Sequence, residues 1–160
     1  ASAEAPVVEE IELEAQQAMA IYDSAMVTDM GAVMAQNFEL LHKRIRGQAS
    51  GVPFAVYYNW SDNAPIHFRV AVPVAEEMRE SGVVTSYERP AGKALKAVCK
   101  GNYDGLAALH NEMDLYMAEH HLKLRGKGVY EEYVVGPADS PDSNDWITFV
   151  VYPVADSLQP

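Results

Sequence analysis

The chain has 160 residues, of which 12 are basic and 23 acidic, so its formal charge is −11 at pH 7, and it contains one cysteine. A single cysteine excludes a disulfide scaffold, and the negative charge argues against direct binding to nucleic-acid phosphates. Because 49% of the residues are hydrophobic but the apolar runs are short, we expect a globular core and no membrane span. The charge favours neutral or cationic partners over anionic ones.

An internal repeat with an offset of 76 residues organises the chain. The matches include Val7 with Val83, Ala18 with Ala94 and Tyr57 with Tyr133. Residues 72–75 read Val-Pro-Val-Ala and residues 152–155 read Tyr-Pro-Val-Ala, so both copies close on a similar phrase. We therefore expect one domain over residues 1–160, built from an N-terminal copy, 7–75, and a C-terminal copy, 83–155.

Local signals in the N-terminal copy predict strands, one helix and a hairpin. Thr28 is typical of a helix N-cap, and apolar residues at helical spacing predict a helix that ends near Gly47. Two runs rich in aromatic and branched residues, separated by turn-forming residues, predict the hairpin. The expected strands are 7–13, 18–26, 54–59 and 66–74.

The C-terminal copy repeats this order. A cap at Asp104 and apolar residues from Leu106 predict a helix that continues to about Gly126. The expected strands are 93–100, 129–135 and 146–153. The hairpin loop 136–145 is longer than its counterpart, so a specialised feature is expected there, while 75–82 is predicted to be a linker or a short helix.

The two copies together predict the fold class. The helix and hairpin of one copy cannot bury their apolar faces without a partner, whereas two fused copies can. We expect an α+β fold in which two tandem strand-helix-strand-strand repeats form one antiparallel sheet, with two helices on one face. A ligand furrow is expected at the pseudo-twofold seam, because clefts between modules favour ligands.

Three stretches carry a family resemblance that extends over residues 7–154. They are Lys-Gly-Asn-Tyr-Asp at 100–104, Gly-Val-Tyr-Glu-Glu-Tyr at 128–133 and the terminal run 148–154. The chain resembles the GyrI-like small-molecule-binding domain, which also serves as the effector-binding module of AraC-type and MerR-type transcription regulators. The resemblance implies a protein that binds a hydrophobic or cationic small molecule. Because no helix-turn-helix motif is present in the sequence, we expect a stand-alone binding module, and we expect it in the cytoplasm. Whether the N-terminus results from processing of an exported protein stays open.

The resemblance places ligand-binding roles on Tyr130, Glu131 and Tyr133. Strand alternation puts Glu131 and Tyr133 on one face and Tyr130 and Glu132 on the other, so one glutamate must face the covered side. A buried carboxylate needs a donor or a positive charge, which a cationic ligand supplies. Which glutamate faces inward stays open, because the family usually has an apolar residue at position 132.

Further ligand contacts are expected from the hairpins and helices. Repeat symmetry places Tyr57 near Glu131, aromatic rings can attract a cation, and methionine fills irregular gaps. The candidates are Tyr57, Trp60, Trp146, Phe149, Met34 and Met113. The methionine stripe also fits an ordinary core, and Phe149 stands where the family often has an acidic residue.

Alternative functions follow from the same residues. Some similar GyrI-like proteins hydrolyse cyclopropane-bearing natural products, so Glu131 could act as a general base while Tyr133 orients water. The family also includes gyrase inhibitors, which implies a protein-binding role, and haem binding is a further alternative. The histidines have no i, i+4 pair and Cys99 has no partner thiol, so we expect no metal site and no required cofactor. Oligomeric state is not predicted.

Overall fold

A computed structural model describes residues 6–156. The chain divides into two compact units. The N-unit is Glu14–Ala91, and the C-unit comprises residues up to Leu13 together with those from Gly92 onward. Within residues 6–156, each unit has one α-helix and antiparallel strands, which confirms the α+β class.

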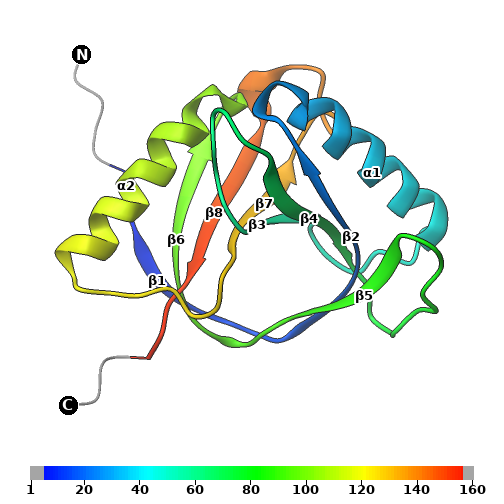
Figure 1. Ribbon diagram of the computed structural model, residues 1–160, viewed down its shortest axis with the longest axis horizontal. Coiled ribbons are helices and arrows are strands. Elements are labelled where there is room, and N and C mark those ends of the chain that lie inside the picture. The colour runs from blue at the N-terminus through cyan, green and yellow to red at the C-terminus, as the bar shows by residue number, and fades with distance from the viewer. Residues whose placement is uncertain (1–5, 157–160) are drawn as a thin grey trace. The chain divides into compact units, whose positions relative to one another are not determined.

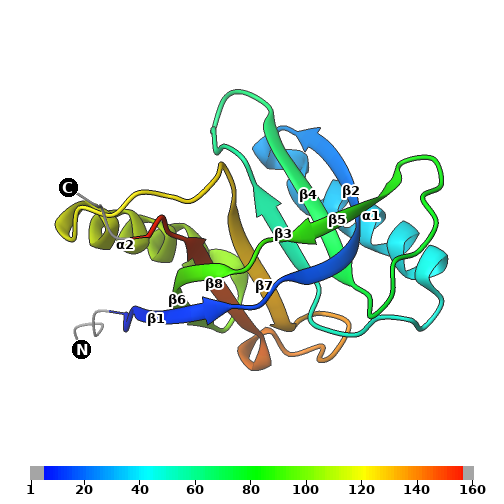
Figure 2. The same cartoon turned by 90° about the horizontal axis from the view of Figure 1, so that it is seen from below.

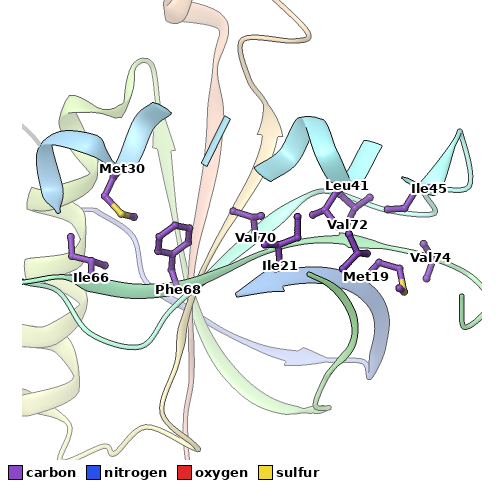
Figure 3. Close-up of a cluster of buried hydrophobic side chains, with 11 residues drawn as sticks. Met19, Ile21, Met30, Leu41, Ile45, Ile66, Phe68, Val70, Val72 and Val74 are labelled. Atoms are coloured by element: carbon purple, nitrogen blue, oxygen red, sulfur yellow. The ribbon is translucent and has the colours of Figure 1, made fainter. Parts of the chain in front are cut away.

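The described residues of the N-unit contain one helix, α1 (Met30–Ile45), and four strands. The strand order is β3-β4-β2-β5, and every pair is antiparallel. The strands are β2 (Gln16–Ala25), β3 (Phe54–Tyr57), β4 (Ile66–Pro73) and β5 (Val84–Arg89). One face of this sheet packs against α1 through Met19 and Ile21 of β2, several β4 residues, and Leu41 and Ile45 of α1 (Figure 3).

The described residues of the C-unit repeat this plan with α2 (Leu106–Glu119) and the strand order β1-β6-β8-β7. Its strands are β1 (Glu9–Leu13), β6 (Gly92–Lys100), β7 (Val129–Val135) and β8 (Ile147–Pro153). Figure 1 shows α2 running beside β6 and β8. Its apolar stripe packs on Leu95, Ala97, Val150 and other sheet residues, so the core of this unit lies between α2 and the sheet.

The first strand of each sequence copy belongs to the unit formed by the other copy. β1, from the N-terminal copy, pairs with β6 along the edge of the C-unit sheet (Figure 2). β5, from the C-terminal copy, pairs with β2 in the N-unit. The compact units therefore do not coincide with the sequence copies 7–75 and 83–155, and the single functional domain over 1–160 stays a prediction.

Both predicted helix starts are displaced by short 3₁₀ turns. Thr28 lies inside the turn Val27–Asp29, and α1 begins after it without a side-chain cap. In the second turn, Tyr103–Gly105, the cap is Asn102, whose side chain accepts a hydrogen bond from the Asp104 N–H. A short polar side chain marks the start of a helical segment, but it does not say whether the first turn is 3₁₀ or α.

The C-terminal end of α2 comes earlier than predicted, at Glu119 instead of near Gly126. His121 adopts a left-handed conformation with φ of 55°, and the Leu122 N–H donates to the Met117 carbonyl at 2.8 Å. These are the features of a Schellman motif, in which glycine usually takes the left-handed position. A histidine in that position gave no signal in the sequence.

Gly92, at the start of β6, should be intolerant of a side chain. Its φ is +145°, and a Cβ there would lie 2.6 Å from the guanidinium carbon of Arg125, which donates to the Lys93 and Val154 carbonyls. Gly92→Ala should therefore lower the free energy of unfolding by about 1–3 kcal/mol, measured by urea denaturation. Gly31→Ala is the control, because it lies in α1 with open space around it and should be neutral or stabilising.

Candidate functional site

Glu131 lies on the face of β7 that α2 covers. It is opposite Val150 of β8, which is itself opposite Ala97 of β6, and both of these neighbours are fully buried against α2. Glu131 is only 5% exposed, whereas Glu132 is opposite Phe149 on the other face and is half-buried. Glu131 is thus the carboxylate that faces the covered side.

The carboxylate of Glu131 has protein partners on both oxygens. The Tyr133 hydroxyl donates to Oε1 at 2.8 Å, and His110 Nε2 of α2 lies 2.7 Å from Oε2. The other ring nitrogen of His110, Nδ1, is 2.8 Å from the Tyr152 hydroxyl on β8. The result is a continuous network, Tyr133–Glu131–His110–Tyr152, which supplies the donors that a buried carboxylate requires.

Aromatic rings extend from this network toward the loop 136–145. The ring centroids of Tyr103 and Tyr133 are 6.0 Å apart at an interplanar angle of 65°, and those of Tyr103 and Trp146 are 4.9 Å apart. The indole of Trp146 donates to the Ser140 carbonyl at 3.0 Å, so the loop fixes this ring. The loop 136–145, for which a specialised feature was predicted, therefore positions the aromatic side chain at the end of this row of rings.

The network affects the titration of its neighbours. Burial raises the pKa of the Cys99 thiol, and the charge of Glu131 raises it further. Burial also raises the pKa of Tyr103, with Glu131 and Asp139 adding to the effect. The pKa of Tyr152 is raised by burial and then by Asp114 and Glu131. These groups consequently keep their protons near neutral pH, and Cys99 is not an activated nucleophile.

The two units provide an internal comparison of this site. The strand registers and the 76-residue offset make Ala55 equivalent to Glu131, Met34 equivalent to His110 and Tyr57 equivalent to Tyr133. In the N-unit the Tyr57 hydroxyl donates to the Met34 sulfur at 3.4 Å, and Ala55 is fully buried. The equivalences continue for Val72 with Tyr152, Phe68 with Thr148 and Phe38 with Asp114.

This comparison shows that the fold does not require a polar network at these positions. The N-unit builds the same strands and helix around apolar side chains, whereas the C-unit places a carboxylate and an imidazole there. Thr148 Oγ1 is also buried in the C-unit and has no hydrogen-bond partner among the described residues. Burying such groups costs free energy, so their presence favours a functional reason.

A comparison with known families follows from this geometry. A family model described as the GyrI-like small molecule binding domain matches residues 6–155. The chain belongs to this GyrI-like family. The resemblance predicted from residues 100–104, 128–133 and 148–154 is thereby confirmed.

Solved structures share the GyrI-like fold at low sequence identity. The EcmrR–DNA complex matches with a TM-score of 0.81 and 16% identity, over 94% of this chain but only 57% of that chain. The EcmrR C-terminal domain matches with a TM-score of 0.78 and 16% identity, over 94% of this chain and 98% of that chain. SAV2435 bound to tetraphenylphosphonium has a TM-score of 0.70 and 12% identity, over 93% and 94% of the two chains.

A further solved structure, described as a hydrolase from Listeria innocua, matches over 92% of this chain and 91% of that chain. Its TM-score is 0.62 and its identity is 11%. No curated protein sequence matches this GyrI-like chain. The structural matches establish a common fold, and the chemistry of the site must be argued from its own residues.

Not all the residues predicted to bind a ligand gather around Glu131. Tyr130 and Phe149 lie on the opposite face of their strands, and the Phe149 ring lies 3.8 Å from Lys96 Nζ. Met113 is fully buried in the core between α2 and the sheet, which agrees with the alternative of an ordinary core residue. Of the predicted set, Tyr133 contacts Glu131 directly, and Trp146 joins the adjoining rings.

Three other predicted residues, Tyr57, Trp60 and Met34, belong to the N-unit. The Tyr57 ring has an edge contact with Trp60 at a centroid distance of 5.9 Å, and Trp60 is 59% exposed. The proximity of Tyr57 to Glu131 and the furrow at the seam stay predictions. The residues that sequence reasoning missed are His110, Tyr152 and Tyr103, which all belong to the C-unit.

A second aromatic cluster, in the N-unit, already contains a cation. The guanidinium carbon of Arg69 lies 5.4 Å from the ring centroid of Tyr22, 5.5 Å from that of Tyr58 and 5.3 Å from that of Tyr87. The Arg69 side chain also donates to the Tyr58 hydroxyl. These rings consequently attract the protein's own cation, which makes them a poorer place for a cationic ligand.

Other features of the described residues add no competing site. Residues 77–80 line a shallow surface depression of about 460 Å³, which includes none of the predicted ligand contacts. Within residues 6–156, no three histidine, cysteine, aspartate or glutamate side chains are grouped as metal ligands. No helix in the same range is long and apolar enough to cross a bilayer.

Proposed function

We propose that this GyrI-like chain binds a hydrophobic organic cation beside Glu131. The observation that carries the proposal is the nearly dry carboxylate of Glu131, 5% exposed, at a position where the N-unit has a buried alanine. The fold alone does not explain this acid. A cation of low hydration energy can supply opposite charge to it without itself losing strong contacts with water.

The surroundings of Glu131 suit such a ligand. The Tyr133 ring adjoins the carboxylate, and the rings of Tyr103 and then Trp146 continue from it. A cation over an aromatic ring gains about 0.5–2 kcal/mol. The partnerless hydroxyl of Thr148 lies on the same sheet face, opposite Tyr133 in the neighbouring strand. SAV2435, which has the same fold, was solved with the cation tetraphenylphosphonium. That ligand is therefore a suitable probe.

Thermal unfolding with two ions of matched shape tests the proposal. Tetraphenylphosphonium and tetraphenylborate have the same size and opposite charge. Tetraphenylphosphonium at 100 times its Kd should stabilise the folded protein by about 2.7 kcal/mol, and tetraphenylborate should not. Equal stabilisation by both ions would show binding driven by apolar area alone, and no stabilisation by either would contradict the proposal.

A second candidate function is hydrolysis of a strained electrophile. The observation that favours it is the direct hydrogen bonding of Glu131 to His110 and Tyr133, a set of groups that can accept and donate protons. Glu131 would remove a proton from water, and Tyr133 would orient the water. Turnover of a cyclopropane-bearing electrophile that Glu131→Gln abolishes would select this function over binding alone. A cytoplasmic location and a role in transcription regulation stay predictions.

A further inference from the structure

The charge of Glu131 already has a partner in the protein. His110 Nε2 lies 2.7 Å from Oε2, and the side chains of His110 and Glu131 are 23% and 6% exposed. A cation that binds beside Glu131 must therefore share the carboxylate with this imidazole. The proton content of His110 then decides how strongly the cation is held, because two positive charges beside one buried carboxylate repel each other. This step rests on the function proposed above.

The hydrogen bonds around the imidazole define where its protons are. Nε2 faces a carboxylate oxygen, so Nε2 must be the donor in that hydrogen bond. Nδ1 faces the hydroxyl of Tyr152, which has a single proton to give. The Tyr152 hydroxyl also lies 3.4 Å from the backbone carbonyl of His110, to which it donates. With its proton directed to that carbonyl, Tyr152 accepts from Nδ1.

Both ring nitrogens of His110 thus face acceptors in the ligand-free protein, an arrangement that an imidazolium satisfies and a neutral imidazole does not. We propose that a cationic ligand binds at Glu131 in exchange for the proton of His110. In this exchange the Nδ1–H or Nε2–H proton passes to solvent, the imidazole becomes neutral, and the ligand takes over the role of positive partner to the carboxylate. The net charge of the site stays constant.

The other titratable groups that face this pair come from α2, β6, β7, β8 and the turn before α2. They are Asp114, Cys99, Tyr133, Tyr152 and Tyr103. Burial raises the pKa of Cys99, Tyr103 and Tyr152, so these three keep their protons over the range in which histidine titrates. The N-unit offers no equivalent group, since Met34 occupies the position of His110.

Exchange predicts that affinity depends on pH in one direction. At low pH the ligand must displace a proton from His110. Its association constant should therefore increase as the pH rises, by up to about tenfold per pH unit. Once His110 is neutral in the free protein, no proton is left to displace and the affinity should level off. A site with a fixed carboxylate and no exchange would show no such increase over the histidine range.

Calorimetry of the wild-type chain with tetraphenylphosphonium tests this directly. Titrations in buffers of different ionisation enthalpy measure the number of protons released per ligand. We expect the number of protons released to be largest at acid pH and to fall toward none as the pH rises. Binding without proton release at every pH would overturn the exchange but leave the proposed function intact. Absence of binding at every pH would overturn both.

Two variants assign the proton to its residue. His110→Gln keeps an N–H donor beside Glu131 but cannot be charged, so its binding should release no proton and should not weaken at low pH. His120→Gln is the matched control, because His120 contacts Tyr116 at a centroid distance of 4.1 Å, outside the network. It should release protons as the wild type does. Proton release that persists in folded His110→Gln would overturn the assignment.

Discussion

His110→Met alone should lower the free energy of unfolding by about 3 kcal/mol, because it leaves the carboxylate of Glu131 buried without its positive partner. The same residue type occupies the equivalent position in the N-unit, where Met34 packs against the apolar core and its sulfur accepts from Tyr57. Methionine is therefore sterically suited to this place in the fold. The loss should come from the unpaired charge and not from poor packing.

The double variant His110→Met with Glu131→Ala separates these two causes. It gives the C-unit the pair of residues that the N-unit already has, and it removes the buried charge together with its partner. Its free energy of unfolding should return to within about 1 kcal/mol of the wild type, because replacing a whole buried ion pair with apolar groups is often neutral. Urea denaturation followed by circular dichroism measures both variants.

A single variant as stable as the wild type would show that Glu131 finds another donor without His110. A double variant as unstable as the single one would show that the loss comes from packing around α2. Burying the Glu131–His110 pair costs free energy, and the N-unit shows that the fold does not require such a pair. Either result would contradict this argument. The two variants together thus test whether the network is a functional addition to a duplicated scaffold.

The fold could be predicted because its signals are repeated and local. The apolar stripe of each helix, the branched residues of each hairpin and the 76-residue offset all indicate the same arrangement twice. The boundaries were harder, since the end of α2 depends on a left-handed His121 and the helix starts depend on 3₁₀ turns. Backbone conformations of this kind leave little trace in residue type.

The candidate site could be predicted only in part. Glu131 and Tyr133 follow from strand alternation and from the family resemblance. Because Glu131 and Glu132 are adjacent, however, the sequence did not show which of the two glutamates faces the covered side. His110 had a signal that was not used: it interrupts an apolar stripe of α2 that also contains Leu106, Met113 and Met117. It also stands at the offset position of Met34. A polar residue where the other copy has an apolar one is the pattern that marks this site.

Glu131→Gln should weaken binding of tetraphenylphosphonium about 10- to 100-fold, which corresponds to the loss of about 1.5–3 kcal/mol of interaction with a charged group. The amide keeps the shape of the side chain, and its oxygen can still accept from Tyr133 or His110. The fold should therefore persist while the negative charge disappears. Titration calorimetry at a pH where the wild type releases no proton measures the change without a contribution from proton release.

Glu132→Gln is the matched control for this measurement. It removes the same charge from the neighbouring residue, whose side chain faces the opposite side of β7. Its affinity for tetraphenylphosphonium should stay within about twofold of the wild type, because a partly exposed charge on the far face is screened by solvent. Equal losses in the two variants would show that the cation responds to the overall acidity of the chain. A loss confined to Glu131→Gln would place the cation beside the one carboxylate that the C-unit holds away from water.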